Sequence, residues 1–182
     1  MDKKLIKLLL AGNNRYNMDL INDHVGANQE LFDKLIKIML HASTPIPQRA
    51  AWAMTTIVDR NPCLAFKQLN KLIDAMPTFK HQALTRSLLR VLCQVDIPND
   101  KMGILFDQCF RLLNDTKQPA AIRVFAMQVL YNIAEREPEL KPELKLIIET
   151  QLENSSPGLK NRAGKLIAKL NASICVNITI KT

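Results

Sequence analysis

Four groups of apolar residues recur along the 182-residue chain at nearly constant spacing, and this repetition restricts the possible folds most strongly. Within each group the residues are four, three and four positions apart, which places them on one side of a helix with 3.6 residues per turn. Successive groups are offset by 38, 38 and 37 residues. The groups are Ile46/Ala50/Ala53/Ile57, Leu84/Leu88/Val91/Val95, Ile122/Ala126/Val129/Ile133 and Leu159/Ala163/Leu166/Leu170.

Each group lies on the second helix of a pair, and a first helix is predicted before it. One period therefore holds two helices joined by a short turn. One such pair cannot bury its apolar side alone, whereas a stack of pairs can. We therefore predict an all-α fold, an α-solenoid of about five antiparallel helical pairs in a single domain over residues 1–171. Residues 1–26 form a shorter, more polar capping pair, and the full pairs cover about residues 27–61, 62–97, 98–137 and 138–171.

The last residues follow a different pattern. Ile174, Val176, Ile178 and Ile180 alternate with more polar neighbours, a period of two that is typical of a β-strand. We predict a tail over residues 172–182 that is disordered, docks on the last helix or pairs with another copy of the chain.

Three turns carry an arginine just inside the following helix: Arg49 in STPIPQRAA, Arg123 in DTKQPAAIR and Arg162 in SSPGLKNRA. Helical pairs of this length with such turns resemble HEAT-like repeats, which are related to armadillo-like helical repeats. The resemblance covers about residues 27–171. It implies a right-handed superhelix with the first helices on the convex side, the second helices on the concave side, and a role as a protein-binding scaffold.

The same resemblance implies a ladder in which an aspartate in each turn meets the arginine of the second helix. Among the full repeats only Asp115 supplies such an aspartate, and only Arg49 and Arg162 occupy the same position relative to their apolar group. We therefore do not treat the turn arginines as one repeated site.

The charge of the chain is concentrated at its end. Residues 1–154 hold 20 basic and 17 acidic side chains, whereas residues 155–182 hold five basic side chains and no acidic one. Such a patch suits an acidic protein partner or the phosphates of a nucleic acid; a solvated outer face of a capping helix is the alternative without function. The candidate residues are Lys160, Arg162, Lys165 and Lys169.

A second group of candidates lies on the predicted concave side. Solenoids bind partners through shallow surfaces anchored by aromatic and arginine residues, and the candidates of this kind are Arg49, Trp52, Arg90, Arg123 and Tyr131. Some HEAT-like proteins are DNA glycosylases that remove alkylated bases with a catalytic aspartate. Asp59, seven residues after Trp52, is the residue that such an enzyme would use here.

We expect a non-catalytic protein–protein interaction scaffold, with nucleic-acid binding, including a divergent alkylation-repair glycosylase, as the alternative. No catalytic motif is present, and we expect no cofactor and no metal site, because the cysteines and histidines lack ligand spacing. The opening residues contain too short an apolar run for a signal peptide. We therefore expect a soluble, cytoplasmic protein without a membrane segment, whose cysteines are reduced and buried.

Overall fold

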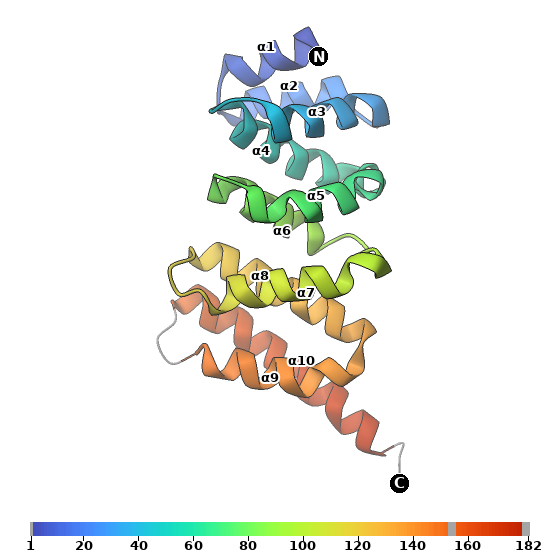
Figure 1. Cartoon of the computed structure of the whole chain (residues 1–182), viewed down its shortest axis with the longest axis vertical. Coiled ribbons are helices and arrows are strands. Elements are labelled where there is room, and N and C mark those ends of the chain that lie inside the picture. Colours follow the sequence, from blue (N-terminus) through green and yellow to red (C-terminus); the bar gives the residue numbers. More distant parts are fainter. Residues whose placement is uncertain (1, 153–155, 180–182) are drawn as a thin grey trace. The chain divides into compact units, whose positions relative to one another are not determined.

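The computed structural model describes residues 2–152 and 156–179, with side chains described up to residue 172. Every regular element in these ranges is helical (Figure 1). These ranges hold ten α-helices and four short 3-10 helices. The all-α prediction is thereby confirmed. None of the described helices combines the length and the apolar character needed to cross a membrane.

The chain divides into two compact units, Met1–Pro98 and Asn99–Thr182. The division falls close to the predicted border between the second and third full pairs. A single domain over residues 1–171 and a right-handed superhelix stay predictions.

Unit 1 contains three helical pairs, of which the third has an interrupted first helix. The pairs are α1 (Lys3–Ala11) with α2 (Arg15–Val25), α3 (Gln29–His41) with α4 (Ile46–Arg60), and α5 (Leu69–Ala75) with α6 (Gln82–Leu92). Two 3-10 segments flank α5, η1 (Pro62–Gln68) and η2 (Met76–Thr78).

The first three helices begin at side chains suited to helix N-termini. Oxygens of Asp2, Asn14 and Asn28 accept hydrogen bonds from backbone N–H groups three residues further on, at 2.8, 2.8 and 3.0 Å. These bonds satisfy N–H groups that a helix leaves without a partner in its first turn.

The third pair differs from its prediction at both helices. The helix predicted before the group that begins at Leu84 is interrupted: its first half forms η1, which opens with a hydrogen bond of 3.2 Å from Leu64 N to Asn61 O. Such i→i+3 bonding is common where a helix starts. The second helix ends at Leu92, short of Val95, because Gln94 N bonds to Val91 O at 3.0 Å and Pro98 disfavours helical backbone before it.

Unit 2 contains two helical pairs: α7 (Met102–Asn114) with α8 (Ala120–Arg136), and α9 (Lys141–Thr150) with α10 (Pro157–Thr179). The 3-10 segments η3 (Asn99–Lys101) and η4 (Pro138–Leu140) precede α7 and α9. α8 packs against α7 and α10, so the second pair stacks on the first.

The predicted apolar groups form much of the core in both units. Of the sixteen residues only Ile46 is half-buried, and none of the others is more than 8% exposed. A buried Ile or Leu contributes about 1.5–3 kcal/mol, so these residues are a main stabilising term. In α3, Phe32 is fully buried and its neighbour Leu31 only half-buried.

The strand prediction for the tail is wrong for residues 172–179, which continue α10. A lone strand would leave its backbone groups without partners, whereas extending an existing helix adds one hydrogen bond for each residue. No proline follows Pro157 to interrupt it. Residues 180–182 lie outside the described part of the chain.

The predicted burial of the cysteines holds only in part. Cys109 is buried, Cys93 is half-buried and Cys63 is exposed. The side chain of Cys175 lies outside the described residues.

Candidate interaction sites

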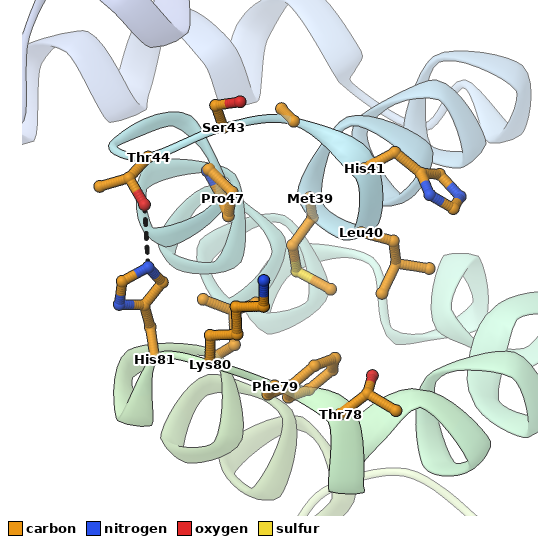
Figure 2. A pocket seen from close by; sticks show the side chains of 12 residues that line it. Met39, Leu40, His41, Ser43, Thr44, Pro47, Thr78, Phe79, Lys80 and His81 are labelled. Atoms are coloured by element: carbon orange, nitrogen blue, oxygen red, sulfur yellow. Dashed lines mark hydrogen bonds between the residues drawn. The ribbon is translucent and has the colours of Figure 1, made fainter.

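A hollow of about 540 Å3 opens in unit 1 between the α3–α4 turn and the turn that leads from η2 into α6 (Figure 2). We call it the turn-edge hollow. Apolar and polar side chains line it, and none of them is acidic. They are Met39, Leu40, His41, Ala42, Ser43, Thr44, Pro47, Thr78, Phe79, Lys80, His81 and Leu84.

One hydrogen bond links the two turns beside the turn-edge hollow. The hydroxyl of Thr44 lies 2.8 Å from Nε2 of His81, and the two residues are 37 positions apart. Lys80, which directly precedes His81, is exposed and makes no hydrogen bond or ion pair with another described residue. No sequence motif identified these residues; the one available signal was that Thr44 and His81 are about one repeat period apart.

Arg49 and Arg90, two residues predicted to bind a partner, are engaged within unit 1. Arg49 Nη1 donates to the carbonyl oxygens of Leu9 and Leu10 at 2.8 and 3.1 Å, so this side chain closes the end of α1. Arg90 forms an ion pair of 2.5 Å with Asp59. Both therefore have internal roles that the sequence did not indicate.

Trp52 is half-buried on α4, between residues that are fully buried. Asp59, near the end of the same helix, accepts hydrogen bonds from Arg90 and from Gln94, the latter at 2.9 Å. The Arg90 side chain thus neutralises the carboxylate from the α6 side.

Arg123 is buried in unit 2 and lines no exposed surface. Its exposed fraction is 8%; Nε donates to Leu113 O at 3.0 Å and Nη2 donates to Gln151 Oε1 at 2.8 Å. Gln151 in turn donates to Asn114 at 2.8 Å. The side chain therefore joins the α7–α8 turn to the end of α9.

Tyr131 and Lys169 lie together in unit 2. The Lys169 ammonium is 5.6 Å from the centre of the Tyr131 ring, a distance that allows a cation–π interaction. Burial raises the pKa of the Tyr131 hydroxyl, and the nearby Glu135 carboxylate raises it further. The ring is only 8% exposed, so it supports Lys169 and offers little surface of its own.

The basic residues of α10 border the exposed half of the helix. Lys160, Lys165 and Lys169 are exposed, and Arg162 is half-buried. At about 100° per residue, Lys165 and Lys169 lie close together, whereas Lys160 lies about 140° or more from either. Between these borders the exposed positions carry small side chains, Asn161, Gly164, Ala168 and Ala172. We call this surface the α10 lysine face.

The sequence as a whole also matches a known family. A family model described as a HEAT repeat domain matches residues 6–170. The chain belongs to the HEAT repeat family. No curated protein and no solved structure gives a significant match.

In this HEAT repeat chain the aspartate–arginine ladder is not formed at the one turn whose sequence offers both residues. Asp115 accepts hydrogen bonds from Lys117 N at 3.0 Å and from Gln118 Nε2 at 2.9 Å, within its own turn. These bonds, the Gln118 bond first, lower the pKa of Asp115. Arg123 instead bonds to Leu113 and Gln151.

A second hollow of this HEAT repeat chain lies within unit 2, between the start of α7 and η4. Its volume is about 440 Å3, and apolar side chains such as Phe106 and Leu140 line it. Asp107, Glu137 and Glu139 also line it, although the spacing of the acids around this turn did not predict that any of them would converge. Glu139 is exposed, so these carboxylates form a solvated acidic border, opposite in sign to the α10 lysine face.

Proposed function

We propose that this HEAT repeat chain is a non-catalytic protein-interaction scaffold that binds an acidic segment of a partner protein on the α10 lysine face. Members of such repeat families bind partners along extended surfaces. The observation that carries the proposal is the arrangement on α10: lysines on both borders, small side chains between them, and no acidic residue from 155 to 182.

The shape of this surface suits a partner segment that lies along the helix. A Cβ atom built on Gly164 would meet nothing within 4 Å, so the centre of the face is open. A segment placed there can approach the backbone of α10 closely, while lysine side chains reach its carboxylates from either border. Lys169 is already held over Tyr131, which reduces the conformational entropy lost on binding.

The proposal includes a cytoplasmic location. The free, exposed thiol of Cys63 supports it, because disulfides persist mainly in oxidising compartments.

Binding of a labelled poly-glutamate peptide, measured by fluorescence anisotropy, tests the proposal. We expect a variant with Lys160, Lys165 and Lys169 changed to Glu to lose binding. Lys3, Lys4 and Lys7 on α1 are also exposed, and their change to Glu is the matched control that should retain binding. Equal binding by both variants would contradict the proposal.

Nucleic acid is the second candidate, since lysines also neutralise phosphates. Labelled duplex and single-stranded DNA, measured at two salt concentrations, distinguish it. If about three phosphates were neutralised, log K would fall with log salt at a slope of about −3. DNA binding tighter than peptide binding at both salt concentrations would favour nucleic acid over the acidic protein.

A further inference from the structure

The turn-edge hollow of unit 1 is separate from the α10 lysine face and has a chemistry of its own. No acidic side chain lines it, whereas Lys80, His41 and His81 do. Its volume of about 540 Å3 falls in the usual range of ligand sites, about 300–1,000 Å3. The hollow therefore has the size and the sign of charge to hold an anionic group with part of its carrier.

Lys80 is the side chain best placed to meet that anionic group. Figure 2 shows its ammonium pointing into the space between Pro47 and Met39. It has no partner among the described residues, so pairing with a ligand would break no contact within the chain. The ring of His41 points away from this space, and the ring of His81 is held by Thr44.

Apolar surface lies beside the ammonium. Met39 and Pro47 are buried under the hollow, while Leu40 and Phe79 are half-buried and keep part of their surface accessible. An apolar side chain placed against Leu40 and Phe79 would be stabilised in proportion to the apolar surface removed from water. A ligand with an acidic and an apolar group close together uses both features.

The backbone adds to the positive potential at this edge. Helices α4 and α6 both begin here, and neither start is capped by a side-chain hydrogen bond. Helix N-termini carry partial positive charge, which favours a nearby carboxylate.

We propose that the turn-edge hollow binds a short acidic segment of a partner protein, with a carboxylate at Lys80 and an adjacent bulky apolar side chain against Leu40 and Phe79. A scaffold of this family with two such surfaces, one in each unit, would hold a partner at two points. The proposed binding at the turn-edge hollow can be tested independently of the proposed binding at the α10 lysine face.

Binding of a labelled peptide of alternating aspartate and leucine tests this proposal. We expect Lys80→Glu to weaken binding about tenfold, because an attractive charge pair becomes a repulsive one. Lys67→Glu is the matched control: Lys67 is exposed in η1 of the same unit, lies outside the hollow and should change binding less than twofold. Circular dichroism would verify that both variants are folded.

Two further measurements separate this site from the α10 lysine face. A peptide of alternating aspartate and serine should bind more weakly, since it lacks the apolar group. Backbone amide signals of residues 40–44 and 78–81 should shift on titration, and the α10 triple variant should still bind. Three results would overturn the proposal. The first is an affinity for the peptide that Lys80→Glu leaves unchanged, and the second is a loss of peptide binding in the α10 triple variant. The third such result is the absence of saturable binding at millimolar peptide.

Discussion

The two units differ at the edge of the repeat where the turns between paired helices lie. In unit 1 the two neighbouring turns are linked by the exposed Thr44–His81 hydrogen bond of 2.8 Å, and a hollow remains between them. In unit 2 the buried Arg123 joins Leu113 to Gln151, and Gln151 bonds to Asn114. The Thr44–His81 and Asn114–Gln151 links both span 37 residues, so each joins one repeat to the next.

This difference shows what determines whether a turn edge is open. Arginine has five donors in a planar fork and can bond to a backbone carbonyl and a side-chain amide at once. A hydroxyl and an imidazole make one short link and leave the space beside it empty. A change in a few turn residues can therefore keep the stacked core of a repeat and replace a stabilising link by an open hollow.

The largest expected effect comes from placing a charge in the core of one unit. Ile57 and Ile133 are equivalent positions of the repeat and each is 1% exposed. We expect Ile133→Asp and Ile57→Asp each to cost more than about 4 kcal/mol in their own unit, because an unpaired carboxylate is buried.

Trp52, the sole tryptophan, belongs to unit 1 and reports on that unit separately. Urea unfolding followed by Trp52 fluorescence and by circular dichroism would show whether Ile133→Asp affects unit 2 alone or both units. Identical wild-type and variant curves would contradict the assigned core.

Removal of the arginine link should have the next largest effect. Arg123→Ala leaves the Leu113 carbonyl and the Gln151 amide without their donor, and we expect a loss of about 3 kcal/mol. Arg162→Ala, at a half-buried arginine on α10, is a control that should cost less than about 1 kcal/mol. Urea unfolding followed by circular dichroism measures both, and equal costs would argue against Arg123 as the link in unit 2.

The link in unit 1 should contribute much less. Thr44→Val keeps the shape of the side chain and removes the hydroxyl, and we expect a loss of less than about 0.5 kcal/mol because the site is exposed to water. Trp52 fluorescence during urea unfolding is the measurement. A loss as large as that of Arg123→Ala would abolish the contrast between the two edges.

Low pH should destabilise the turn edge of unit 2, which contains Asp115, slightly more than the turn edge of unit 1, which contains Thr44 and His81. The pKa of Asp115 in the α7–α8 turn is lowered below 3.8 by its bonds to Gln118 and Lys117, so the ionised form is favoured in the folded chain. The resulting stabilisation is complete above the pKa of the unfolded chain and is lost as pH falls through the folded pKa. Asp115→Asn should remove this component of the pH dependence below about pH 5, measured by thermal unfolding.

Much of the fold follows from the sequence, because one pattern of spacing repeats with different residues. Ile122 and Leu159 both occupy the first position of their group and both are buried. In α3 the sequence does not decide between the neighbours Leu31 and Phe32, which are both apolar; the structure buries Phe32 and leaves Leu31 half-buried. The alternation of residues 174–180 is typical of a strand, whereas residues 172–179 continue α10, because extending a helix adds backbone hydrogen bonds that a lone strand lacks.

The sites were less predictable than the fold, because the same residue type has different roles in different turns. Arg49 closes the end of α1, Arg123 links two turns and Arg90 neutralises Asp59. Each role depends on which carbonyl or carboxylate lies within reach, and that distance is set by packing between pairs. Trp52 and Arg90, grouped as candidates from the sequence, form no cation–π contact among the described residues, whereas Tyr131 and Lys169 do meet.

The bonds from Arg49 to Leu9 and Leu10 give the N-terminal pair a fixed place in unit 1. A guanidinium from one repeat holds the final carbonyls of a helix about forty residues earlier. Shortening the protein by deleting α1 and α2 would leave that cation without acceptors and uncover the buried side of α4. The first pair therefore caps the end of unit 1 and is held there by Arg49 of the next repeat. Any shortened version of the protein has to keep this pair or replace Arg49.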